Sequence, residues 1–294
     1  MEFSTRAATS ADAEAMYRLI ETAELGWHGQ AETVPDQVAA DLRRPELDLA
    51  RDTLLVLAPN GDLAGWVWVH LGKRVQIEVH PSYRGQGIGT RLLDWAVARA
   101  REVGTDWIGQ AVDDADKAGT DLLLSRGADV LATNWLLERP LVAVEPGELP
   151  DGIRFGTYDP ARSHDVHELI EDAFSAFQPR RKPYDEWVEL TVERDTFLPD
   201  ATTLAYAGDE LVGAVLALDL PGSDEGYVEQ VAVRSDQRNK GLARAMLDQT
   251  SAAFLQRGLR GLILWTHSGT GALAMYERLG LRVRRSTTVY RLYL

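Results

Sequence analysis

One unusual segment occurs twice in this chain of 294 residues. Residues 75–93 read VQIEVHPSYRGQGIGTRLL, and residues 229–247 read EQVAVRSDQRNKGLARAML. Each copy consists of a short apolar strand, polar or turn residues, an arginine, a glycine-rich loop and an amphipathic helix. The corresponding glycines, Gly87 and Gly241, are 154 residues apart, which is the size of a whole domain. We therefore expect a duplicated α/β domain whose two copies can be compared residue by residue.

A glycine-rich loop just before a helix is suited to bind a phosphate group. The first N–H groups of a helix lack intrahelical partners, and the helix dipole places positive potential there. Glycines let an anion approach the backbone, where successive amides can form a concave nest. The alternative is a tight turn in which glycine only relieves backbone strain. Because the pattern occurs twice, we expect a pyrophosphate site formed by Arg84, Gly85, Gln86, Gly87, Ile88, Gly89 and Thr90, and in the second copy by Arg238, Asn239, Lys240, Gly241, Leu242, Ala243 and Arg244.

Composition narrows the function class. The length fits two domains of roughly 145 residues each. A formal net charge of −14 argues against a general nucleic-acid binder and is compatible with a cationic amine substrate. The chain has no cysteine, which excludes a disulfide framework, a thiolate nucleophile and a cysteine metal site. With no signal pattern and no membrane-spanning apolar run, we expect a cytoplasmic protein without a membrane partner, either a monomer or a homodimer.

The order of predicted elements also repeats. A helix with Ala13, Met16, Tyr17 and Ile20 on one face corresponds to one with Val166, Leu169, Ile170, Ala173 and Phe174. Hairpins are predicted to turn at Asn60-Gly61 and at Gly208-Asp209. Proline and glycine between residues 140 and 152 indicate a connection. We therefore expect domains at 1–142 and 153–294, joined by a linker at 143–152.

The repeated segment resembles the coenzyme A pyrophosphate loop of the GCN5-related N-acetyltransferases (GNAT), with the pattern Arg/Gln-x-x-Gly-x-Gly/Ala after a valine-rich strand. The resemblance covers essentially the whole chain as two tandem domains. It implies that each domain has a mixed β-sheet, splayed between its fourth and fifth strands and flanked by helices, which holds the pantetheine arm of acetyl-CoA. It also implies that main-chain groups of Val231, Ala232 and Val233, and of Val79 in the first copy, bind this cofactor.

Acetyl transfer to an amine needs a base for the ammonium proton and a donor for the departing thiolate. Glu229 lies on the strand before the second loop, and period-two geometry places it on one face with Val231 and Val233. The resemblance implies that Glu229 is the base. The alternative is a solvated or paired carboxylate.

Tyr276 lies in the segment ALAMYERLGL, which resembles the family pattern Ala-x-x-x-Tyr-x-x-x-Gly-Phe. In that family the tyrosine donates to the coenzyme A sulfur, so the resemblance makes Tyr276 the acid. The alternative is a tyrosine that only packs. The family's frequent asparagine, seven residues earlier, is Gly269 in this chain, and Ser268 or Thr270 could replace it.

Counting the same spacing in the first copy gives Leu123 at the acid position and Val75 at the base position. Leucine cannot donate a proton and valine cannot accept one. Glu78 and His80 are nearby, but Glu78 is predicted to point to the strand face opposite Val75. We therefore expect the first domain to be catalytically silent, although it can still hold coenzyme A.

His164 and His167 flank Asp165, but no third ligand is near in the sequence, so no metal site is expected. The function predicted from these patterns is acetyl-CoA-dependent N-acetylation of a primary amine on a small metabolite, such as an amino sugar or an antibiotic, in the second domain. Two alternatives are a non-catalytic module that senses acyl-CoA and an acetyltransferase that acts on peptide or protein N-termini.

Overall fold

The computed structural model describes residues 3–143, 149–176 and 180–294. The chain forms two compact units: residues up to 134 together with 285–294 make the first unit, and residues 135–284 make the second unit. Both units combine a mixed sheet with helices, so the α/β class and the tandem arrangement predicted from the repeat are confirmed. Among these ranges, no helix has the length and apolar character needed to cross a bilayer.

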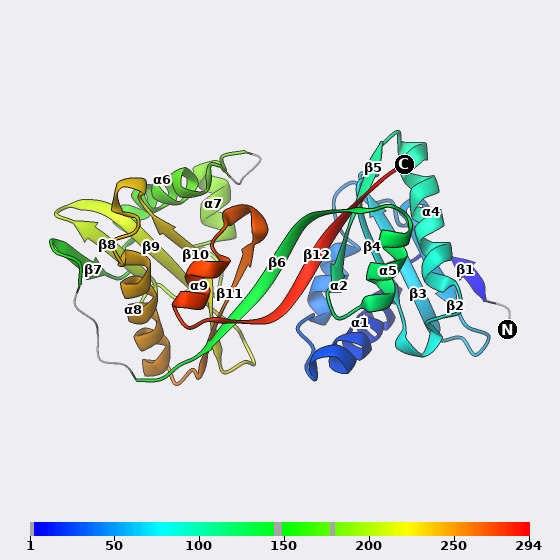
Figure 1. Cartoon of the computed structure of the whole chain (residues 1–294), viewed down its shortest axis with the longest axis horizontal. Coiled ribbons are helices and arrows are strands. Elements are labelled where there is room, and N and C mark those ends of the chain that lie inside the picture. Colours follow the sequence, from blue (N-terminus) through cyan, green and yellow to red (C-terminus); the bar gives the residue numbers. More distant parts are fainter. Residues whose placement is uncertain (1–2, 144–148, 177–179) are drawn as a thin grey trace. The chain divides into compact units, whose positions relative to one another are not determined.

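The first unit has its helices on both faces of the sheet (Figure 1). Its strands in spatial order are β1 (Ser4–Arg6), β2 (Thr53–Leu57), β3 (Leu63–His70), β4 (Arg74–Val79), β5 (Trp107–Asp113) and the end of β12 (Arg282–Tyr293). Its helices are α1 (Ala13–His28), α2 (Pro35–Asp41), α3 (Leu49–Asp52), α4 (Ile88–Val103) and α5 (Lys117–Ser125). β4 and β5 pair in parallel, whereas β1 with β2, β2 with β3, β3 with β4, and β5 with β12 pair antiparallel.

Two apolar clusters hold the first unit together. On one face Met16, Tyr17 and Ile20 of α1 pack with Trp66 and Trp68 of β3, which confirms the apolar stripe predicted for this helix. On the other face α4 packs against β4, β5 and the end of β12. The sheet therefore separates an α1/α2 face from an α4 face.

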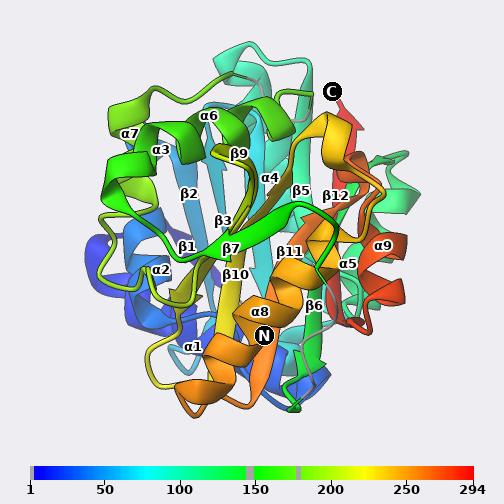
Figure 2. The same ribbon diagram turned by 90° about the vertical axis from the view of Figure 1, so that its left-hand side faces the viewer.

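The second unit repeats this plan, with α6 and α8 on opposite sides of the sheet (Figure 2). Its strands in spatial order are the end of β6 (Asp129–Pro140), β11 (Gly261–His267), β10 (Glu225–Val233), β9 (Glu210–Asp219), β8 (Thr203–Ala207) and β7 (Ile153–Gly156). Its helices are α6 (Ser163–Phe174), α7 (Tyr184–Leu190), α8 (Leu242–Gln256) and α9 (Leu273–Arg278). The sheet separates an α6/α7 face from an α8/α9 face.

Both predicted hairpins are present. β2 and β3 turn at Gly61, and β8 and β9 turn at Gly208. Gly61 has a φ of 87° and Gly208 a φ of 62°, a region that glycine enters without steric cost. The turn residues therefore predicted both connections correctly.

The predicted domain boundaries differ from the compact units at two strands. β6 begins in the first unit and ends in the second, whereas β12 begins in the second and ends in the first. Residues 287–293 of β12 pair with β5. The repeat did not reveal this exchange because it depends on long-range hydrogen-bond partners, which spacing does not encode. Half of the predicted linker 143–152, namely residues 144–148, lies outside the described residues.

Candidate functional site

The two glycine-rich loops have nearly the same backbone conformation. Gly85 and Gly87 have φ angles of 73° and 78°, and the matching Asn239 and Gly241 have angles of 63° and 82°. Left-handed residues that alternate with ordinary ones turn successive N–H groups toward one point, which is the geometry of an anion-binding nest. Each loop leads directly into a long helix, α4 or α8. Both loops therefore have the geometry that a phosphate group requires.

In the second unit, the two parallel strands at the centre of the sheet separate beside this loop. β10 and β11 are paired from Glu225 to Val228, and beyond Val228 β10 stays paired with β9 as far as Val233. A cavity of about 430 Å³ lies along the unpaired part. Its lining includes Glu229, Gln230, Val231 and Val233 of β10, Trp265, Thr266 and His267 of β11, Phe174 of α6, and Met275 and Tyr276 of α9. The splayed sheet predicted for this unit is thus confirmed.

The unpaired edge of β10 presents backbone groups toward this gap. The N–H group of Arg234 donates to the carbonyl of Val212 on β9, at 2.9 Å. Because backbone groups alternate sides along a strand, those of Val231 and Val233 point away from β9 and toward the separated β11. This is the pattern needed to bind an extended chain between the strands.

Glu229 lies at a β-bulge, so its side chain is on the opposite face of the sheet from the one predicted. The register between β10 and β9 shifts between Val228 and Gln230. Val231 and Val233 pack on the α8/α9 face, whereas Glu229 interacts with Tyr227, which packs on the α6/α7 face. The prediction that all three side chains share one face is wrong because the bulge inserts a residue and interrupts the period of two.

The surroundings of Glu229 make its carboxyl more basic than usual. Burial raises its pKa, against the attraction of Arg194 and Lys182 and a hydrogen bond from Tyr227. The Arg194 guanidinium is 3.8 Å from the Glu229 carboxylate, too far for a direct hydrogen bond. A partly buried carboxyl beside a cavity, with its pKa raised by burial, is a candidate proton acceptor. Sequence reasoning missed Arg194 and Tyr227, because neither belongs to a recognisable motif.

Tyr276 lines the same cavity from the α8/α9 side. Its side chain is only 7% exposed, and burial raises its pKa to about 12. Among the described residues, no charged or hydrogen-bonding neighbour contributes to this shift alongside burial. The phenol therefore keeps its proton at neutral pH and is available to donate it. Glu229 and Tyr276 thus border one cavity from opposite faces of the sheet.

Most of the predicted loop residues border this cavity as well. Those that line it are Arg238, Asn239, Gly241, Leu242, Ala243 and Arg244. Lys240 is not among the lining residues, and its ammonium donates to the Gln237 side chain at 3.1 Å. Ala232 faces the α6/α7 core instead and is 1% exposed. Thr270, one of the two residues that could replace the family's asparagine, does border the cavity. Its hydroxyl, however, donates to the carbonyl of His267.

The first unit has no residue equivalent to Glu229. β4 pairs with β3 without a register shift, so Val75 lies opposite Val69 just as Val228 lies opposite Ala217. The predicted equivalence of Val75 and Glu229 is therefore wrong: Glu229 is the extra residue of the bulge. Leu123, at the predicted acid position, is 3% exposed in the α4 core.

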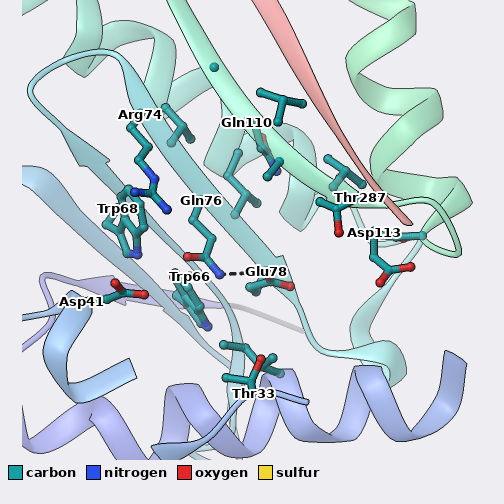
Figure 3. A pocket seen from close by; sticks show the side chains of 18 of the residues that line it. Thr33, Asp41, Trp66, Trp68, Arg74, Gln76, Glu78, Gln110, Asp113 and Thr287 are labelled. Carbon is teal, nitrogen blue, oxygen red and sulfur yellow. Dashed lines mark hydrogen bonds between the residues drawn. The ribbon is translucent and has the colours of Figure 1, made fainter. Parts of the chain in front are cut away.

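Glu78 does point away from Val75, as predicted. It lies opposite Trp66 in the register and lines a cavity of about 580 Å³ on the α1/α2 face (Figure 3). Residues 84–90 of the first loop do not border this cavity. Arg84 instead lies 3.9 Å from the Asp116 carboxylate and 4.9 Å from the centre of the Trp27 ring. The first unit therefore has a loop of the right shape and, separately, a polar cavity.

The paired histidines have structural surroundings. His164 stacks on Tyr184 with ring centres 3.6 Å apart, and His167 is buried with Nε2 2.9 Å from the carbonyl of Lys182. Among the described residues, no group of three or more His, Cys, Asp or Glu side chains is arranged to hold a metal ion. These contacts account for both histidines without a ligand.

Comparison with known proteins agrees with this geometry. The model of the acetyltransferase (GNAT) family matches residues 14–127 and 163–281. A mycothiol acetyltransferase of Thermobispora bispora is 27% identical over 247 residues, covering 81% of this chain and 82% of that protein. A mycothiol acetyltransferase of Salinispora tropica is 31% identical over 239 residues and 75% of each chain.

Solved structures give the same result. A GCN5-related N-acetyltransferase from Sphaerobacter thermophilus is 25% identical and superposes with a TM-score of 0.79, covering 98% of this chain and 95% of that one. A tandem GNAT protein from the clavulanic acid biosynthesis pathway superposes with a TM-score of 0.71 at 16% identity, over 99% and 98% of the two chains, which supports the fold.

Proposed function

Since the chain belongs to the acetyltransferase (GNAT) family, we propose that its second unit transfers the acetyl group of acetyl-CoA directly to a primary amine of a small metabolite. The observation that carries this proposal is the cavity of the second unit. It adjoins the anion-binding loop, the unpaired edge of β10, a carboxyl of raised pKa and a protonated phenol.

The residues around this cavity fit the cofactor. The N–H groups of the loop that contains Asn239 and Gly241 would bind the pyrophosphate, with Arg238 and Arg244 beside them. Backbone groups of Val231 and Val233 face the gap in which the pantetheine chain would lie. When bound, acetyl-CoA supplies an acetyl group activated as a thioester.

Each side chain then has a defined task. Glu229 removes a proton from the substrate ammonium, directly or through a water molecule, and so exposes the attacking lone pair. The N–H groups of β10 at the gap stabilise the oxygen on which negative charge develops. Tyr276 donates a proton or a hydrogen bond to the departing sulfur. With no cysteine in the chain, no acetyl-cysteine intermediate is involved.

The acceptor is a small amine, such as an amino sugar or an antibiotic. We place the acceptor of mycothiol acetyltransferases first among the candidates, because two similar proteins carry that name. The acidic net charge of −14 favours a cationic substrate over a polyanion. In this proposal the first unit is silent in acetyl transfer and keeps a loop that can hold coenzyme A.

Calorimetric titration of the intact protein with acetyl-CoA tests this proposal. Gly241→Glu forces a left-handed φ on a non-glycine residue and places a carboxylate in the nest, yet no atom within 4 Å obstructs its Cβ. Gly87→Glu is the matched variant of the first loop, and it has the same open surroundings. We expect Gly241→Glu to abolish binding to the catalytic unit together with acetyl transfer.

The two variants also count the sites. If Gly87→Glu removes a second binding event without changing turnover, both loops bind acetyl-CoA and the second unit alone performs the chemistry. If the intact protein binds no acetyl-CoA, or if acetyl transfer survives Gly241→Glu, the proposal fails.

A further inference from the structure

The cavity on the α1/α2 face of the first unit has a basic end, where β4 begins. Lys73 and Arg74 line the cavity there, together with Trp68 of β3 and Trp107 of β5. Arg74 is four residues from Glu78 on the same strand, about 13 Å along the backbone, and Figure 3 shows the two side chains well apart. The glycine-rich loop follows the Glu78 end of β4, so the basic end is the part of the cavity farther from that loop.

The alternation of the strands places the lining side chains of this end on one face of the sheet. Val75 of β4 and Ile108 of β5 pack on the α4 face, so their neighbours Arg74 and Trp107 point to the α1/α2 face. Trp68 of β3 packs on that same face. The sheet therefore presents one guanidinium and two indole rings to the start of the cavity.

Lys73 and Arg74 have aromatic rather than acidic neighbours. The Arg74 guanidinium lies 5.6 Å from the centre of the Trp68 ring, and the Lys73 ammonium lies 5.0 Å from the centre of the Trp107 ring. In the described part of the chain, neither cation forms an ion pair with a carboxylate. A ring face attracts a cation but does not neutralise its charge. Both cations are therefore able to bind an anion.

The positive charge at this end exceeds the negative charge beside it. Arg44 also lies over the Trp68 ring, 5.7 Å from its centre, and it pairs with the Asp41 carboxylate. Desolvation of its guanidinium and the charge of Arg44 lower the pKa of Arg74, and Asp41 offsets only part of this effect. A lowered pKa means that these surroundings disfavour the charged form of Arg74. An anion bound beside it would stabilise that form.

The second unit has no cations at the matching positions. Counted from the matching residues Val75 and Val228, residues 226–227 of the second unit stand in place of residues 73–74. They are a glycine and a tyrosine instead of a lysine and an arginine. The basic end is therefore a property of the first unit and not of the duplicated fold.

From this arrangement we infer that the first unit has an anion-binding subsite at the start of β4, which takes the carboxylate or phosphate group of a small organic molecule. The planar guanidinium of Arg74 donates to two oxygens of the anion, and the Lys73 ammonium adds a second charge. The cavity, with a volume of about 580 Å³, holds the rest of the molecule. This subsite does not depend on the proposed function of the second unit, because the two cavities share no lining residue.

The test compares three probes of similar size at constant ionic strength: glucose 6-phosphate, gluconate and neutral glucose. The intact protein carries ¹⁵N in its tryptophan indoles. Trp107→Phe identifies the signal of Trp107, and Trp265 reports on the cavity of the second unit. We expect at least one of the two anions to shift the Trp107 signal at millimolar concentration, and glucose to bind at least about tenfold more weakly. The tighter of the two anions tells whether the subsite prefers a phosphate or a carboxylate.

Two variants with the same change in charge assign the effect to one place. Arg74→Gln removes the guanidinium from the cavity and should weaken the response of Trp107 to the anion about tenfold or more. Arg101→Gln removes an exposed guanidinium from α4, on the other side of the sheet, and should leave that response unaltered. The dispersion of the indole signals shows whether each variant is folded.

The inference is overturned if neither anion moves the Trp107 signal at millimolar concentration, if glucose moves it equally well, or if folded Arg74→Gln retains the affinity. An equal loss of affinity in Arg101→Gln would also overturn it, because the anion would then respond to the overall charge of the protein. A response confined to Trp265 would overturn it as well, while leaving the proposed function of the second unit in place.

Discussion

β4 of the first unit and β10 of the second run beside loops of the same conformation, but they differ by one inserted residue. β4 follows its neighbour β3 without interruption, whereas β10 bulges and projects Glu229 toward the α6/α7 face. The bulge places a carboxyl beside the gap between the parallel strands. In the first unit the carboxyl on the corresponding face is Glu78, two residues nearer the loop than Gln76. Duplicated domains can thus diverge by moving an acidic group along a strand as well as by losing it.

The largest effect is expected from Glu229→Gln. If the bulge supplies the base and the first unit has no equivalent, kcat/KM should fall about 100-fold or more, because glutamine cannot accept the ammonium proton. Steady-state kinetics with acetyl-CoA and an amine acceptor measures the loss. Glu229→Asp retains the carboxylate and should recover part of the rate. A fall of less than tenfold in Glu229→Gln would remove the catalytic distinction between β4 and β10.

A pair of core variants tests whether the cores of the two units are packed equally well. Leu93 in α4 and Leu247 in α8 occupy matching positions in the repeat and are both fully buried. Truncation of either to alanine should lower the free energy of unfolding of its unit by about 2–5 kcal/mol. Denaturant unfolding, followed by a probe in each unit, measures both. A negligible cost for only one variant would show that the two cores are not packed equivalently.

Tyr276→Phe tests the other side of the cavity. The ring still fills its buried position, but the proton for the departing sulfur is lost, so turnover should fall about tenfold or more. Calorimetry should find acetyl-CoA binding retained. Unchanged turnover would mean that Tyr276 packs as Leu123 does in the first unit, and that the assigned acid is wrong.

The smallest expected effect concerns pH. Glu229 must be deprotonated to act as a base, so kcat/KM should fall as pH decreases through its raised pKa. Arg194 holds that pKa down, and Arg194→Met should therefore move the acidic limb of the pH profile to higher pH. Arg257→Met, which removes an exposed pair with Asp200, provides the control. An acidic limb that does not move with Arg194→Met would argue against Glu229 as the titrating group.

Much of this architecture could be predicted from the sequence. The repeat, the glycine at each loop and the apolar stripes of α1 and α6 reflect local geometry, so they predicted the tandem α/β fold, whereas the splayed strands were predicted from the resemblance to the GNAT family. The position of Glu229 could not be predicted fully, because a bulge changes the count of residues without leaving a composition signal. The cavity bordered by Trp66 and Glu78 is formed only by the tertiary fold. Family spacing therefore predicted the proposed catalytic cavity of the second unit and missed the cavity of the first.

The exchange of β6 and β12 has a consequence for how the protein is made. The last ten residues belong to the first unit, where Tyr290 and Leu292 are buried in its core. During synthesis the first unit cannot complete its sheet until the C-terminal residues leave the ribosome. Its β5 edge stays open while almost the whole second half is translated, and an open edge invites pairing with other chains. Loss of a few C-terminal residues should therefore be felt in the half of the molecule that was synthesised first.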